Sequence, residues 1–118
     1  MPRRAAAPPP SAYQRALRRL ARRDHSVAEL RRALVERGHD AAEVEAALER
    51  LRGERYLDDA GFAERFARSR LAHQGLGRLR IRQGLRQRGV DRGEAEAGIA
   101  GALRDVDERE VLAGLARR

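Results

Sequence analysis

The sequence predicts an all-α protein of tandem three-helix repeats that stack into an elongated, curved body. Ala, Arg, Glu and Leu, which favour helices, make up more than half of the 118 residues, whereas Val and Ile are scarce and Thr is absent. Apolar residues recur with helical spacing, and glycines interrupt them at regular intervals. Several short motifs also return 51 residues further along the chain, as expected for a repeat.

The first helix is predicted from Ser11 to about Arg23. Residues 1–10 end in Ala-Pro-Pro-Pro and resemble a disordered, polyproline-like tail. After Ser11, a possible N-cap, apolar residues occupy one face of a helix and arginines the opposite face. The apolar positions are Tyr13, Ala16, Leu17, Leu20 and Ala21.

The second and third helices are predicted from their start and stop signals. Ser26 with Glu29, and Asp40 with Glu43, have the spacing of capping boxes, in which side chains satisfy the free N–H groups of the first turn. Gly38 stops the second helix in a left-handed conformation, and a later glycine stops the third. The inward-facing residues are Val27, Leu30, Leu34, Val44, Ala47, Leu48 and Leu51.

Four further helices are predicted in the second half of the chain. Asp58 or Asp59 caps a helix over residues 59–74, which directs Phe62 inward and is broken by glycines. A helix over about 78–88 ends at Gly89, and Asp91 opens the next helix. A last short helix is predicted over about 107–117.

The repeat unit follows from the spacing of these signals. Gly38 and Gly89 are 51 residues apart, as are Asp40 and Asp91. We therefore expect one three-helix repeat over 11–56 and a second over 57–105. Residues 106–118 then form the first helix of an incomplete third repeat. Such repeats stack on their neighbours and offer one long face rather than a deep pocket.

The charge predicts an anionic partner. All 26 basic residues other than histidine are Arg, against 18 acidic residues, and the net charge is +8. Nucleic acid is the default partner of such a chain, because the guanidinium group binds phosphate with two hydrogen bonds. Two clusters are the candidate partner- or DNA-binding residues: Arg15, Arg18, Arg19, Arg22 and Arg23 in the first helix, and Arg78, Arg80, Arg82, Arg86 and Arg88 in the fifth.

Each cluster has an alternative interpretation as a solvated face neutralised by neighbouring Glu residues. The two interpretations are balanced for the first cluster. For the second we favour binding, because its helix contains no acidic residue. Arg70 lies on the apolar side of its helix, so we expect it to form a structural ion pair with Asp58 or Asp59.

No catalytic or metal-binding pattern is evident. The chain has no Cys, which excludes disulfides and thiolate chemistry. His25, His39 and His73 are isolated, and all four aromatic residues fit core or staple positions rather than base-stacking platforms. The helix after Gly38 carries three Glu residues, which argues against a DNA-reading helix-turn-helix. We expect a cytoplasmic monomer that is not an enzyme and uses no cofactor, metal, membrane or small-molecule substrate.

Three segments then indicate a family. His25-Ser26-Val27-Ala28-Glu29-Leu30, followed by Leu34 and Gly38, resembles the first signature of the bacterial RecX regulatory proteins. Tyr56-Leu57-Asp58-Asp59-Ala60-Gly61-Phe62-Ala63 resembles their central signature, and residues 75–90 resemble the segment that follows. The resemblance covers about residues 12–118. Its structural signature residues are Ser26, Glu29, Leu30, Gly38, Tyr56, Leu57, Asp58, Asp59, Phe62, Arg70 and Gly89.

The resemblance implies a function. Proteins of this family bind the RecA recombinase filament and modulate, usually inhibit, its ATPase, strand-exchange and coprotease activities in DNA repair and the SOS response, and some bind DNA. The family usually has three full repeats, whereas we expect only one helix of the third here. The alternative is a basic helical protein that binds single- or double-stranded DNA without a RecA partner.

Overall fold

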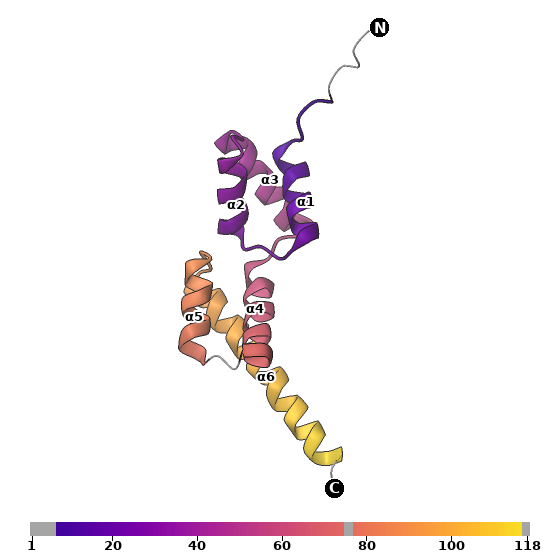
Figure 1. Ribbon diagram of the computed structural model, residues 1–118, viewed down its shortest axis with the longest axis vertical. Helices are drawn as coiled ribbons and strands as arrows, with labels where there is room; N and C mark the ends of the chain where they lie inside the picture. Colours follow the sequence, from indigo (N-terminus) through magenta and orange to yellow (C-terminus); the bar gives the residue numbers. More distant parts are fainter. Residues whose placement is uncertain (1–6, 75–76, 117–118) are drawn as a thin grey trace.

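The computed structural model of the chain describes residues 7–74 and 77–116, and within these ranges the chain forms six α-helices and no strand (Figure 1). The helices are α1 (Ala12–Arg22), α2 (Val27–Glu36), α3 (Ala41–Gly53), α4 (Asp59–Gln74), α5 (Arg78–Gln87) and α6 (Arg92–Ala116). The expected all-α class is confirmed. Most of the predicted disordered tail lies outside the described residues, and so does Gly75, one of the glycines expected to end the fourth helix.

The first domain consists of α1, α2 and α3 around a small aliphatic core. The capping boxes at Ser11 and Ser26 are both present, so these two residues fix where α1 and α2 begin. Tyr13, Leu17 and Leu20 of α1 pack against the core from the side. Its buried residues are Ala12, Ala16, Val27, Leu30, Leu34, Val44, Ala47, Leu48, Leu51 and Leu57.

The second domain repeats this arrangement with α4, α5 and α6. A Cβ added to Gly98 of α6 would lie 2.5 Å from the Ala63 Cβ and 2.6 Å from the α4 backbone, so α4 and α6 pack almost backbone to backbone. This contact needs the absence of a side chain at residue 98. The buried residues of this core are Phe62, Ala63, Ala67, Ile81, Leu85, Val90, Ala95, Ile99 and Ala102.

The same turn closes α2 and α5. Gly38 and Gly89 have φ values of +87° and +74°, which glycine adopts without strain. The N–H of each glycine donates to a carbonyl in the last turn of the preceding helix, at 2.9 Å for Gly38 and 3.0 Å for Gly89. The repeat seen in the sequence is therefore also a repeat of backbone conformation.

The two domains lie end to end and give a body of 76 × 32 × 25 Å (Figure 1). Polar groups at helix ends join them. The Ser26 hydroxyl donates to the Arg88 carbonyl at 2.5 Å, and the Val27 N–H donates to the Asp59 carboxylate at 2.8 Å. Asp59, at the start of α4, thus satisfies a free N–H at the start of α2.

A salt bridge and one close packing contact complete the junction. The Arg65 guanidinium donates two hydrogen bonds to the Asp24 carboxylate, at 2.5 and 3.1 Å. A Cβ on Gly89 would lie 2.4 Å from the Ala28 Cβ, so the end of α5 rests directly on the start of α2. The relative position of the domains is set by these few contacts.

Two predicted local features are wrong. A separate helix over 107–117 is not found, because α6 runs without a break over 25 residues. No Gly or Pro lies between Gly101 and Gly114 to stop it. The Asp40–Glu43 capping box is also absent: Asp40 accepts from the Ala42 N–H, whereas Glu43 accepts from the Ala12 N–H at 2.8 Å. The assignment of 106–118 to a third repeat stays a prediction.

Candidate partner-binding surfaces

The arginines of α1 divide into paired and unpaired side chains. Arg15 donates to His39 Nε2 at 2.9 Å, and the other ring nitrogen of His39 lies 3.6 Å from the Glu43 carboxylate. Arg23 lies 3.5 Å from Glu29. Both arginines therefore have an acceptor within the first domain, although Arg23 is itself exposed.

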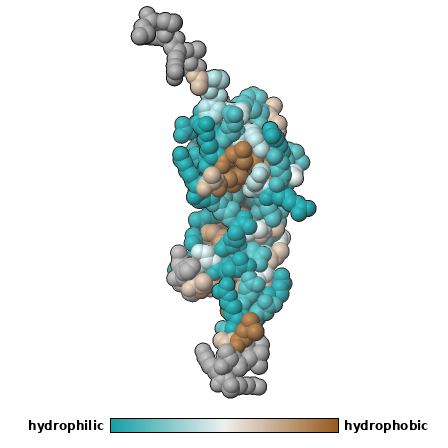
Figure 2. Space-filling view, turned by 90° about the vertical axis from the view of Figure 1, so that its right-hand side faces the viewer, coloured by the Kyte–Doolittle hydropathy of each residue, from teal (hydrophilic) through white to brown (hydrophobic). Residues whose placement is uncertain are grey.

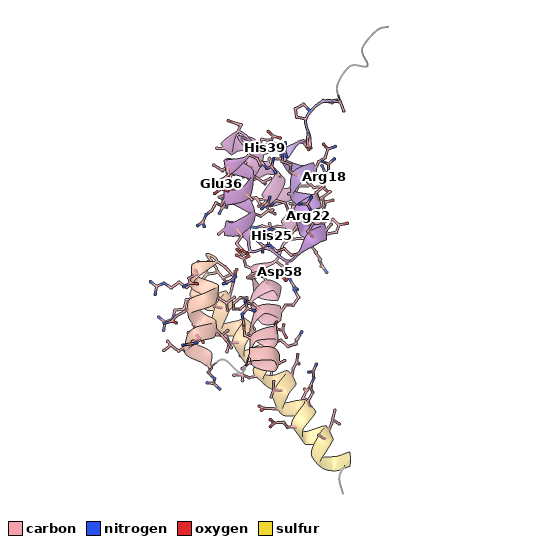
Figure 3. All side chains as sticks on the ribbon, in the orientation of Figure 1. Arg18, Arg22, His25, Glu36, His39 and Asp58 are labelled. Carbon is pink, nitrogen blue, oxygen red and sulfur yellow. The ribbon has the colours of Figure 1, made fainter. Side chains whose placement is uncertain are left out.

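Arg18 and Arg22 are exposed members of this cluster that have no acidic partner among the described residues. They lie one turn apart on α1 (Figure 3), and within the described part of the chain neither forms a salt bridge. Arg19 between them is half-buried. The side of the molecule that carries α1 is mostly hydrophilic, with an apolar area on the first domain (Figure 2). We call Arg18 and Arg22 the α1 patch.

The arginines of α5 divide in the same way. Arg82 donates two hydrogen bonds to the Glu96 carboxylate of α6, which raises the pKa of Arg82 and lowers that of Glu96. The first domain contains the same pair 51 residues earlier: Arg31 donates to Glu45 at 2.6 and 3.2 Å. The pair ties the second helix of each domain to the third.

Arg88 is also engaged within the chain. Its guanidinium lies 4.6 Å from the centre of the Phe66 ring and donates to the Gly84 carbonyl at 2.9 Å. Arg78, Arg80 and Arg86 are exposed and have no salt bridge to another described residue. We call these three side chains the α5 patch.

The helices that carry the two patches lie on different sides of the long axis. In Figure 1, α1 is at the right of the first domain and α5 is at the left of the second. These two helices therefore do not lie on one side of the molecule. A partner that touches both patches has to wrap around the molecule or contact it from two sides.

The ion pair expected for Arg70 is wrong. Its guanidinium lies over the Phe66 ring, 4.4 Å from the centre, on the face of a side chain that also contacts Arg88. Asp58 and Asp59 instead accept backbone N–H groups, Asp58 from Ala60 at 3.1 Å. Burial raises the pKa of Asp59 above its ordinary value, and its hydrogen bond to the α2 backbone opposes that rise.

One aromatic residue departs from its expected core position. The Tyr56 side chain is 60% exposed, beside Arg55, which has a φ of +64°. By contrast, Tyr13 is held by a hydrogen bond to Glu54 and by the Arg50 guanidinium, 3.7 Å from its ring centre. Tyr56 is thus an exposed ring in the linker between the domains that the sequence interpretation missed.

A groove between α5 and α6 also escaped the sequence interpretation. Its volume is about 950 Å³. Arg92, at the start of α6, lines it together with Arg82 and Arg86. Arg92 was missed because it stands alone in the sequence. Comparison with its counterpart 51 residues earlier, the uncharged Ala41, is the signal that could have found it.

The described side chains do not form a catalytic or metal centre. Among them, no three His, Asp or Glu residues are placed to hold a metal ion. His25 is buried and its Nδ1 lies 3.1 Å from the Arg23 carbonyl; burial lowers its pKa. The side chain of His73 lies outside the described part. Of the helices described, none is long and apolar enough to cross a membrane.

Two stacked three-helix domains define this chain as an all-helical protein built of repeats. The chain belongs to the RecX family, whose members are regulatory proteins rather than enzymes. The model of the first RecX three-helix domain matches residues 12–51, and that of the second matches residues 58–99.

Relatives and solved structures agree with this assignment. The regulatory protein RecX of Halorhodospira halophila (strain DSM 244 / SL1) is 46% identical over 107 residues, covering 85% of this chain and 66% of the relative. That of Pseudomonas entomophila (strain L48) is 42% identical, covering 77% and 63%. A crystal structure of regulatory protein RecX superposes with a TM-score of 0.72 at 28% identity, covering 75% of this chain and 45% of the other. The chain thus spans about two thirds or less of these relatives.

Proposed function

We propose that this chain binds the RecA recombinase filament and modulates, mainly by inhibition, its ATPase, strand-exchange and coprotease activities in DNA repair and the SOS response. The observation that carries the proposal is the match of both three-helix domains to the RecX models, in the family's order. The site of action is then the cytoplasm, where the filament forms on DNA.

The exposed arginines support an anionic, filamentous target. A RecA–DNA filament presents phosphates and carboxylates along its length, and an arginine without an internal partner can bind either with two hydrogen bonds. The α1 patch and the α5 patch supply five such side chains on two sides of the elongated body. Binding through them is weakened by salt, because ions screen exposed charges.

The direct test is a titration of the purified full chain into RecA on single-stranded DNA, with the ATPase rate as the readout. We expect the rate to fall at substoichiometric to stoichiometric ratios. The variant Arg18→Glu/Arg22→Glu should inhibit more weakly. Its matched control, Arg32→Glu/Arg37→Glu, makes the same charge change on exposed positions in α2 and at its C-cap, and should inhibit as the wild type does. An unchanged ATPase rate and filament length across the titration would refute the proposal.

A second candidate function is nucleic-acid binding without RecA. The exposed Tyr56 ring beside Arg55 favours it, since an aromatic face next to a cation can stack on an unpaired base. A gel shift with single- and double-stranded DNA, paired with a RecA pull-down in the absence of DNA, separates the two functions. Binding to DNA alone supports the second candidate, and capture of RecA without DNA supports the first.

A further inference from the structure

We propose that the groove between α5 and α6 binds an acidic segment of a partner protein that carries an apolar anchor residue. The anchor would lie against Leu79, Val90 and Ala95, and flanking carboxylates would bind Arg86 and Arg92. This inference rests on the proposed function in one respect, that a partner is a protein. It adds the surface and the chemistry of the segment bound there.

The first argument is the apolar wall of the groove. Leu79 is 66% exposed, among the highest values for a large apolar side chain in the described chain. It lies at the start of α5 and lines a volume of about 950 Å³, enough for a few side chains of a bound segment. An exposed leucine beside a groove gains free energy when another apolar group covers it.

The second argument comes from the first domain, where the corresponding positions are uncharged or small. Leu79 corresponds to Ala28, which is covered by Gly89 of the second domain. Arg86 and Arg92 correspond to Val35 and Ala41. The framework pair is retained, since Arg82–Glu96 repeats Arg31–Glu45.

The three differences therefore lie at the rim and wall of the groove and leave its framework intact. Two of them add a cation, and the third adds an exposed apolar surface. Together they suit a ligand that is both anionic and apolar. The corresponding surface of the first domain lacks these features and does not suit such a ligand.

The third argument is the charge balance, which favours a peptide over nucleic acid. Three arginines and two carboxylates, Asp91 and Glu96, line the groove. Arg82 and Glu96 neutralise each other, so Arg86 and Arg92 face a single unpaired acid. Such a groove can bind one or two carboxylates, whereas a run of phosphates would meet Asp91. The described residues that line it include no aromatic ring for base stacking.

The test uses the full chain and a fluorescent 12-residue peptide with Glu and Leu at helical spacing. Two comparison probes are the same peptide with Ser in place of each Leu and a single-stranded thymidine oligonucleotide. We expect the Glu/Leu peptide to bind and the Glu/Ser peptide to bind at least about tenfold more weakly, because it lacks the anchor. Circular dichroism shows whether each variant used below keeps its helices.

Variants then locate the site. Arg86→Glu/Arg92→Glu should weaken binding of the Glu/Leu peptide at least about tenfold, and Leu79→Ala about threefold. The control Arg32→Glu/Arg37→Glu carries the same charge change in α2 and at its C-cap and should stay within about twofold of the wild type. The proposal is overturned if the control loses as much affinity as the groove variant. It is also overturned if the Glu/Ser peptide binds as well, or if Arg86→Glu/Arg92→Glu weakens the oligonucleotide as much as the peptide.

The result is independent of RecA. If the wild-type chain inhibits RecA but does not bind the Glu/Leu peptide, the groove proposal is wrong and the proposed function still stands. If the wild-type chain binds the peptide but has no effect on RecA, the proposed function is wrong and the groove proposal still stands.

Discussion

The first and second domains share one framework and differ on the helices that face outward. In both, a glycine with positive φ ends the second helix, and an arginine on that helix pairs with a glutamate 14 residues later. On the outer surface, Val35 of the first domain is replaced by Arg86 of the second, and Ala41 by Arg92. The contacts that define the three-helix unit are kept, while the exposed positions have diverged.

This difference teaches where to look for function in a repeat protein. Positions that agree between the copies, such as Leu34 and Leu85, are explained by packing, since both are fully buried. Positions that differ in charge on the outside have no packing role to explain them. The comparison also works inside the cores, where Ala47 of α3 corresponds to Gly98 of α6.

The largest effect is expected from exchanging these two core residues. Gly98→Ala should lower the free energy of unfolding by about 3 kcal/mol, because its Cβ would overlap α4. Ala47→Gly should cost only about 1 kcal/mol, since it loses helix propensity without a clash. Urea denaturation followed by circular dichroism measures both. A Gly98→Ala protein as stable as the wild type would contradict the close packing of α4 on α6.

A smaller effect is expected at the helix starts that follow each first helix. Ser26→Ala removes the cap on the Glu29 N–H and the hydrogen bond to the Arg88 carbonyl, and should cost about 2 kcal/mol. The corresponding residue of the second domain is Gly77, which forms no side-chain cap. Gly77→Ser should therefore stabilise α5 by a few tenths of a kcal/mol, about 0.3. Thermal unfolding of both variants measures these changes in stability. Equal losses of stability in Ser26→Ala and Gly77→Ser would refute the expectation.

The smallest effect concerns the pH dependence of stability, to which Asp59 contributes at the junction between the two domains. Burial raises the pKa of Asp59, whose neighbours include Asp58, Asp91 and Glu94 as well as Arg52. Because the folded-state pKa lies above the unfolded one, this group's contribution to stability is full below its ordinary pKa. It is lost as the pH rises through the raised value.

Asp59→Asn should make the free energy of unfolding less dependent on pH. The Asn side chain does not ionise, yet its amide oxygen can still accept the Val27 N–H. Unfolding free energies measured in steps from about pH 4 to pH 7 test this, a range that starts near the ordinary pKa of Asp. Asp40→Asn, at the start of α3, is the control for loss of a capping carboxylate. If the unfolding free energy of Asp59→Asn changes with pH as steeply as that of the wild type, Asp59 is not the group responsible.

Much of the fold follows from local signals. The helix predicted over 59–74 is α4, Asp59–Gln74, because its cap and its apolar spacing are both contained in the segment. The failures come from competition over a longer distance in one case and from helix geometry in the other. Glu43 has the spacing of a capping box but is bound by the Ala12 N–H of another helix. Arg70 is about 18 Å along the helix axis from Asp58, at 1.5 Å per residue, too far for an ion pair.

The candidate surfaces were predictable only in part. The sequence locates the two arginine clusters but does not show which members are paired, because the partners of Arg15 and Arg82 lie 24 and 14 residues away. The groove depends on three residues that look unremarkable one at a time. Only alignment of the two repeats and their placement side by side in α5 and α6 brings Leu79, Arg86 and Arg92 together.

The junction between the domains has a consequence for the order of folding. Within the first domain, the contacts between the first and third helices join residues such as Ala12 and Glu43, which are 31 residues apart. The junction bond from Ser26 to Arg88 closes a loop of 62 residues. We therefore expect the three-helix units to form first and their mutual orientation to be established last, because the longer loop costs more entropy to close. Since only a few contacts fix that orientation, we expect it also to be the first property lost when the protein opens locally, before either core is exposed.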